Sequence, residues 1–327
     1  MRTRPSRRHV LRVAAAAAAL PALPRLGRAA AYPTRPVRII CGFAAGGAPD
    51  ILARLFAQWL AQRLGQSFIV EDRTGAGGNV ATETVVQAAP DGHTLLLTSM
   101  GNAVNATLYE KLNYDFLHDI APVAGISREP LGMEVQPSFP GGTVPELIAY
   151  AKANPGKINY GSAGIGSSLH MAGELFNLMA GVELVHVAYR GSPPALNDLL
   201  AGQIQLMFCP LPPSLGYVKS GRLRALAVTS AARSTVLPDV PVIGDFVPGY
   251  EASAWYGIGA PAGTPADIVD KLNAEINAGL ADPKLKARLI DLGSVPFPTS
   301  RAEFGQHLAA ETEKWAKVVR AAKIKPQ

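Results

Sequence analysis

The chain has 327 residues, of which 31 are Lys or Arg and 25 are Asp or Glu, giving a formal net charge of +6. Seven of the basic residues and none of the acidic ones lie in residues 1–31, so 24 basic and 25 acidic residues remain in the rest of the chain. This near neutrality argues against a nucleic acid or an anionic membrane as partner. With two cysteines, Cys41 and Cys209, a disulfide framework and a four-cysteine metal site are excluded, and we expect two unpaired thiols.

Residues 1–31 have the order of a cleavable export signal, in which basic residues precede a short apolar run and small residues follow. The apolar run, residues 13–23, is too short to span a bilayer. The segment 6–12 resembles a twin-arginine signal, and an ordinary secretory signal is the alternative. We expect cleavage after about Ala31 and a periplasmic location for the mature protein.

The mature chain opens with a predicted strand, a loop rich in Gly and Ala, and a helix. The strand covers residues 37–40, the loop residues 42–49, and the helix begins with Asp50 as its N-cap and ends at Gly65. The next elements follow in the same alternation: a strand at 68–70, a glycine turn at 75–78, a helix to about residue 89 and a strand at 94–98.

The middle of the chain repeats this unit, with a strand at 157–160, a glycine-rich loop at 161–168 and a helix that ends at Gly181. Further strands are predicted at 184–189, 204–208 and 223–228. The alternation predicts an α/β fold with two lobes, each a mainly parallel sheet flanked by helices. We expect one lobe to comprise residues 32–128 plus 250–327, and the other, with the crossover segments, residues 129–249.

Both glycine-rich loops lead from a strand into a helix, where free backbone N–H groups and the helix dipole favour anions. Neither 42–50 nor 161–168 contains Lys or Arg, so the phosphate-loop pattern is absent and nucleoside triphosphates are not expected. One such loop is equally typical of close packing between a helix and a strand. Two loops in two lobes favour an anion site.

Several segments, in order, resemble the tripartite tricarboxylate transporter substrate-binding family, the Bug or TctC-type receptors. They are residues 32–40, 43–47 with Asp50, 75–79, 89–92, 159–164, 189–191, 223–229, 237–241 and 260–265. The resemblance implies a type II-like periplasmic binding protein, or Venus flytrap, that closes around a small organic acid without cofactor or catalysis. It also implies permease subunits of such a transporter, or a sensor protein, as partners. We expect a monomer.

Carried over by motif, the resemblance implies ligand contacts from both lobes. They are Phe43, Ala44, Ala45, Gly46, Gly47, Asp50 and Ser99 in the first, and Ser162, Ala163, Gly164, Ile165, Gly166, Ser167, Ser168, Tyr189, Arg190 and Cys209 in the second. For Asp50 we favour a structural role, because a capping carboxylate competes with an anionic ligand. Arg190 has two interpretations, a charge for a second ligand carboxylate or a local ion pair. Cys209 stands where the family often has Asp, which suggests a less polar ligand.

Four other interpretations need weighing. His170 and Glu174 stand four residues apart, but without a third ligand they predict no metal site. A hydrolase with Ser162 or Ser167 as nucleophile and His186 as base stays open, although the G-x-S-x-G elbow is absent. Trp255 and Tyr256 are expected in the core. A signalling receptor without a transport role is a further alternative.

Overall fold

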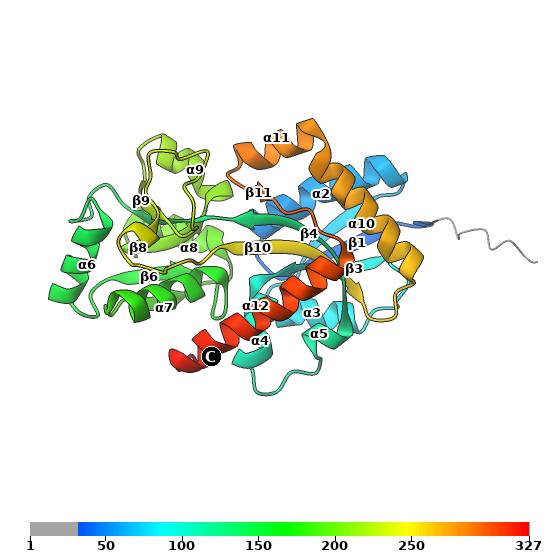
Figure 1. Ribbon diagram of the computed structural model, residues 1–327, viewed down its shortest axis with the longest axis horizontal. Helices are drawn as coiled ribbons and strands as arrows, with labels where there is room; N and C mark the ends of the chain where they lie inside the picture. The colour runs from blue at the N-terminus through cyan, green and yellow to red at the C-terminus, as the bar shows by residue number, and fades with distance from the viewer. Residues whose placement is uncertain (1–31, 327) are drawn as a thin grey trace, which may run out of the picture. The chain divides into compact units, whose positions relative to one another are not determined.

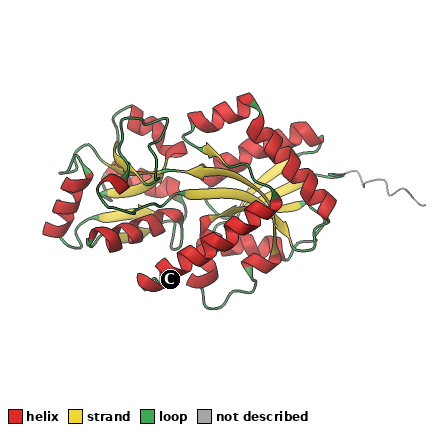
Figure 2. Cartoon of the chain, viewed as in Figure 1, coloured by secondary structure: helices red, strands yellow, loops and turns green. Residues whose placement is uncertain are grey.

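The structure is a computed structural model that describes residues 32–326. Pro33–Gln327 form one compact unit, to which every element below belongs. The fold is α/β, with two separate sheets and helices on the faces of both (Figures 1 and 2). The predicted export signal lies outside the described residues.

The first sheet has six strands in the order β11-β4-β10-β3-β1-β2. β1 is parallel to β2 and β3, whereas β10 is antiparallel to both β3 and β4. The strands are β1 (Val37–Cys41), β2 (Phe68–Asp72), β3 (Thr94–Ser99), β4 (Ile120–Glu129), β10 (Ala254–Pro261) and β11 (Val295–Pro296).

The second sheet has five strands in the order β7-β6-β8-β5-β9. β6 is parallel to β7 and β8, whereas β5 is antiparallel to β8 and β9. The strands are β5 (Leu131–Val135), β6 (Asn159–Ser162), β7 (Val185–Ala188), β8 (Leu206–Pro210) and β9 (Arg224–Val228).

Both sheets are therefore mixed, and the prediction that they are mainly parallel is wrong. In each sheet the strand that arrives from the other sheet is antiparallel to both of its neighbours, β10 in the first and β5 in the second, and β11 adds a further antiparallel pair with β4. Parallel neighbours need a crossover helix, and these two strands enter their sheets without one. The order β2-β1-β3-β10-β4 matches β7-β6-β8-β5-β9, so the predicted repetition of the first unit extends to the whole sheet.

The helices connect the strands and cover the sheets. They are α2 (Ala48–Leu64), η1 (Ala76–Gly78), α3 (Asn79–Val86), α4 (Met100–Leu108), α5 (Phe116–Asp119), α6 (Val144–Ala153), α7 (Ser168–Ala180), α8 (Ser192–Ala201), α9 (Leu211–Lys219), η2 (Ile243–Asp245), α10 (Ala266–Ala281), α11 (Pro283–Asp291) and α12 (Arg301–Ala321). Within residues 32–326 none of them is both long and apolar enough to cross a membrane.

α2 shows why the sequence folds this way locally. Leu52, Phe56 and Leu60 recur at helical spacing and are fully buried against the first sheet, where each contributes about 1.5 to 3 kcal/mol by leaving water. Gly65, with φ of 73°, ends the helix in the left-handed conformation. The helix starts earlier than predicted, with Gly47 and not Asp50 at the N-cap, because Pro49 is tolerated in the first helical turn.

Candidate ligand-binding site

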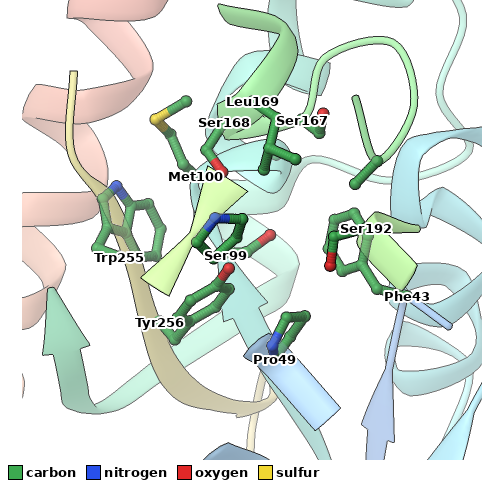
Figure 3. A pocket seen from close by; sticks show the side chains of 13 residues that line it. Phe43, Pro49, Ser99, Met100, Ser167, Ser168, Leu169, Ser192, Trp255 and Tyr256 are labelled. Carbon is green, nitrogen blue, oxygen red and sulfur yellow. The ribbon is translucent and has the colours of Figure 1, made fainter. Parts of the chain in front are cut away.

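Residues from both sheets enclose a small pocket, called the inner pocket below, of about 20 Å³. This is room for one or two water molecules. Trp255 and Tyr256 of β10 lie on one side of it, and Phe43 and Ser192 on the other (Figure 3). Its lining residues are Phe43, Pro49, Ser99, Met100, Gly101, Ala163, Ser167, Ser168, Leu169, Ser192, Pro210, Trp255 and Tyr256.

Five helices begin at the wall of the inner pocket. α2, α4, α7 and α8 each place a residue of their first turn in the lining, and α9 places its N-cap, Pro210, there. Each helix N-terminus carries about half a positive charge, and its first N–H groups have no acceptor within the helix. Two of these N–H groups are missing from both α8 and α9, where prolines occupy the second and third positions. None of the lining residues is charged. The pocket therefore favours an anion through backbone dipoles and N–H donors, without a cationic side chain.

Three side chains add hydrogen-bond donors to this wall. Among the described residues, the hydroxyls of Ser168 and Ser192 have no hydrogen-bond partner, so both are available to a ligand. Burial raises the pKa of the Tyr256 phenol well above 10, so it stays protonated and can donate. Ser167 is committed to the loop, because its hydroxyl donates to the Gly164 carbonyl at 2.7 Å.

The loop after β6 rests on a pair of stacked histidines, His170 and His186, whose ring centroids lie 4.0 Å apart. The Ser162 hydroxyl lies 2.6 Å from His186 Nε2, and Gly166 N–H donates to His170 Nδ1 at 3.1 Å. Burial lowers the pKa of His170 to about 3 and that of His186 to about 4. Both rings are therefore neutral near pH 7 and hold the loop by hydrogen bonds.

A second cavity, called the outer chamber below, has a volume of about 330 Å³. It shares Phe43 and Ala163 with the lining of the inner pocket. Its other lining residues are Gly42, Thr74, Gly75, Ala76, Gly77, Gly78, Tyr109, Gly164, Ile165, Ala188, Tyr189 and Arg190.

A sequence model described as the tripartite tricarboxylate transporter family receptor matches residues 52–324. The chain belongs to this family. It is 36% identical over 299 residues to the protein BugT of Bordetella pertussis, covering 90% of this chain and 92% of BugT. Such receptors are periplasmic solute-binding proteins, as the resemblance implied.

Solved structures agree with this assignment. R. palustris Rpa4515 with adipate matches with a TM-score of 0.88 and 38% identity, over 90% of this chain and 100% of that one. MatC from Rhodopseudomonas palustris with bound malate matches with a TM-score of 0.83 and 33% identity, over 88% of this chain and 100% of that one. The predicted α/β fold of a two-lobed periplasmic binding protein is thereby confirmed.

In this receptor the residues predicted to contact ligand fall into three groups. Phe43, Ser99, Ala163, Ser167 and Ser168 line the inner pocket. Gly164, Ile165, Tyr189 and Arg190 line the outer chamber, together with Phe43 and Ala163. The remaining predicted residues line neither cavity: Ala44, Ala45, Gly46, Gly47, Asp50, Ser162, Gly166 and Cys209.

The loop after β1 faces the start of α8 instead. A Cβ atom placed on Gly191 would lie 2.8 Å from Ala44 Cβ, and one on Gly47 would lie 3.2 Å from Ser192 Oγ. Ala45 is exposed. Asp50 is buried, accepts a hydrogen bond from Gly46 N–H at 2.7 Å and pairs with Arg54 at 2.6 Å, which is the structural role favoured for it.

Cys209 is fully buried, and with Cys41 it is free in the receptor. Its side chain packs with Leu169 and Met207, and only the next residue, Pro210, reaches the inner pocket. Burial raises the pKa of the Cys209 thiol well above 9, so it is an unreactive apolar side chain.

Sequence reasoning missed two residues of the inner pocket that can donate to a ligand, Ser192 and Tyr256. Tyr256 in β10 lies opposite Ser99 in β3. The sequence of either strand alone does not show which residue of the other strand it faces. For Ser192 a signal existed, since a serine followed by two prolines is typical of the first turn of a helix.

Proposed function

We propose that this receptor binds a small organic carboxylate in the inner pocket. The observation that carries the proposal is the convergence of five helix N-termini on a pocket whose lining contains no charged side chain. A carboxylate satisfies such a site because it accepts several N–H and O–H bonds and matches the sign of the helix dipoles. The relatives solved with adipate and malate support the same class of ligand.

The contacts proposed for the carboxylate are Ser168, Ser192 and Tyr256, together with N–H groups at the starts of the helices. The volume of about 20 Å³ is too small for a whole organic acid, so the ligand enters an open form of the receptor. Residues 32–128 plus 250–327 and residues 129–249 are proposed as the two lobes that move. The division of the strands between the two sheets supports these limits.

A thermal-shift screen tests the proposed ligand class. Mono-, di- and tricarboxylates, acidic amino acids, aromatic acids and neutral sugars are added to the purified protein at matched ionic strength. An acid at one hundred times its dissociation constant adds about 2.7 kcal/mol, which raises the melting temperature by several degrees. A shift with sugars and with none of the acids would refute the carboxylate proposal.

For the location, we infer that residues 1–31 are a twin-arginine export signal removed after about Ala31. The pattern of a paired arginine, a short apolar run and small residues supports it. Arg7→Lys with Arg8→Lys is expected to keep the protein in the cytoplasm, as read by cell fractionation. An unchanged periplasmic yield would indicate the ordinary secretory route, and the mass of the exported protein gives the cleavage site.

The role of the bound state is a further part of the proposal. A ligand that favours the closed form presents one surface to a partner. We propose permease subunits of a tripartite tricarboxylate transporter as that partner, with a sensor protein as the alternative. Uptake of the labelled ligand by cells with and without the gene distinguishes them, since a sensor role leaves uptake unchanged.

A hydrolase is the second candidate, because the Ser162 hydroxyl lies 2.6 Å from His186 Nε2. Against it, Ser162 is fully buried, lines neither cavity and already accepts from Gly164 N–H at 3.0 Å. We expect no turnover of p-nitrophenyl acetate above background. Turnover that Ser162→Ala abolishes would establish the enzyme instead.

A further inference from the structure

The inner pocket is too small for the whole ligand, so the rest of the ligand needs space elsewhere. The volume of the inner pocket, about 20 Å³, suits a single carboxylate group. The outer chamber, at about 330 Å³, is large enough for a chain of several carbon atoms. Phe43 and Ala163 belong to both linings, so the two cavities are neighbours at these residues.

The outer chamber also favours negative charge. Arg190 is its one charged lining residue, and no Asp or Glu lines it. Among the described residues Arg190 has neither an ion pair nor a hydrogen bond, so the local ion pair that the sequence allowed for it is not formed. An unpaired guanidinium at a cavity wall offers two parallel N–H donors to a carboxylate.

Part of the lining of the chamber is a glycine-rich stretch of backbone, residues 75–78. Gly77 and Gly78 have φ of 63° and 97°, and the residue before them, Ala76, has a φ of 45°, which only a constrained non-glycine residue adopts. A Cβ atom on Gly77 would lie 3.0 Å from the Ile165 carbonyl oxygen, so this loop and the loop after β6 meet without side chains between them. This stretch adds no charged side chain, so Arg190 is the one charge in the lining that can distinguish between ligand groups.

We propose that the outer chamber is a second acid-binding subsite, in which Arg190 binds the far carboxylate of an elongated dicarboxylate whose near carboxylate occupies the inner pocket. The inference rests on the proposed function and deepens it, because it makes the ligand a dianion and Arg190 the residue that selects it. Phe43 and Ala163 then contact the carbon chain between the two acid groups.

The test is isothermal titration calorimetry with α,ω-dicarboxylates of four to eight carbons and the monocarboxylates of equal length. Arg190→Gln is expected to weaken dicarboxylate binding at least tenfold and to change monocarboxylate binding less than twofold. Arg190→Lys is expected to fall between wild type and Arg190→Gln, because a lysine offers charge without the planar fork. Arg222→Gln is the matched control, since Arg222 is exposed, stacks on Tyr217 and lines neither cavity.

The possible results distinguish a failure of the second subsite from a failure of the proposed carboxylate binding. If acids bind but Arg190→Gln weakens mono- and dicarboxylates alike, or neither, the second subsite is refuted and the inner pocket stands. If no acid binds the wild-type protein, the proposed function fails, and the second subsite fails with it. A circular dichroism spectrum and melting temperature equal to those of wild type are required of each variant before its affinity is compared.

Discussion

The contacts of Asp50 lie within its own loop and helix, so we expect it to hold the loop and not to bind the ligand. Its carboxylate is buried, accepts from Gly46 N–H at 2.7 Å and pairs with Arg54, which is itself half-exposed. Asp50→Ala removes the acceptor of the Gly46 N–H and the partner of Arg54 and is expected to lower the free energy of unfolding by about 0.5 to 1.5 kcal/mol, measured by urea denaturation, because water can reach the exposed Gly46. Asp50→Asn keeps an acceptor and is expected to cost less. Unchanged stability with a loss of ligand affinity would assign Asp50 to the ligand.

The stacked histidines under the loop after β6 predict a loss of stability in acid. Burial lowers the pKa of His170 to about 3 and of His186 to about 4, from an ordinary 6.5. Between pH 6.5 and about 4 the unfolded chain binds protons that the native protein does not, so the free energy of unfolding falls as the pH falls. His186→Asn is expected to make this fall less steep, as measured by urea denaturation from pH 7 to pH 4.5.

The control for the histidine pair is His118→Asn, because His118 is exposed and Asp119 raises its pKa. A histidine with a raised pKa increases the free energy of unfolding as the pH falls, whereas His186, with a lowered pKa, decreases it. If His186→Asn and His118→Asn change the acid dependence in the same direction, the assignment to the buried pair is wrong.

The sequence predicted the two glycine-rich loops of the site but missed Ser192 and Tyr256. The difference lies in how far apart in the chain the neighbouring residues are. Both glycine-rich loops are visible because glycine and the following helix signals are local. Ser192 and Tyr256 reach the inner pocket through strand order and register, which join residues far apart in the chain. Cys209 was predicted to contact the ligand because it stands where the family often has Asp. Side chains alternate along β8, however, and that of Cys209 points into an apolar cluster with Leu169 and Met207.

At the scale of elements, the crossing from β4 to β5 carries two buried acids, Glu129 and Glu134. Ser127 donates to the first at 2.9 Å and Ser214 to the second at 2.6 Å. Burial raises the pKa of Glu129 to about 7 and of Glu134 to about 8, from an ordinary 4.5. Between about pH 4.5 and pH 7, both carboxyls are therefore mostly protonated in the native protein, whereas the same groups are mostly ionised in the unfolded chain.

Those raised pKa values make the protein less stable as the pH rises from about 4.5 to about 8, since the native state holds protons that the unfolded state has lost. One such group contributes a slope of at most about 1.4 kcal/mol per pH unit. Glu134→Gln is expected to flatten the decline, measured by urea denaturation between pH 5 and pH 8.5. Glu251→Gln, an exposed residue, is the control, and equal slopes for the two variants would contradict the assignment.

The same crossing explains what the sequence predicted of the fold and what it did not. Local patterns give the strand, loop and helix units and their repetition, because hydrophobic period and caps lie within a few residues. The boundary between the lobes was predicted close to the end of β4, but nothing local tells that β5 and β10 run antiparallel to both of their neighbours. The sheets are mixed, and not mainly parallel as predicted, because each contains a strand that arrives directly from the other sheet.

At the scale of the whole molecule, we expect ligand entry to require the two lobes to separate, because the inner pocket holds only one or two waters. The loop after β1 and the start of α8 meet in this conformation, with Gly47 near Ser192 and Ala44 near Gly191. Ligand binding shifts the population toward closure only by its preference for the closed form. A wedge between the loop and α8 is therefore expected to oppose the ligand.

Gly47→Leu supplies that wedge without straining the backbone, since φ at Gly47 is −74°. Its Cβ would lie 3.2 Å from Ser192 Oγ, and the rest of the side chain would occupy the space between the loop and α8. We expect at least a tenfold loss of affinity for any acid that binds, and no decrease in radius of gyration when ligand is added in small-angle scattering. Gly216→Leu, at an exposed position with nothing within 4 Å, is expected to behave as wild type. Closure and affinity like those of wild type in Gly47→Leu would mean that this contact is not part of the closed state.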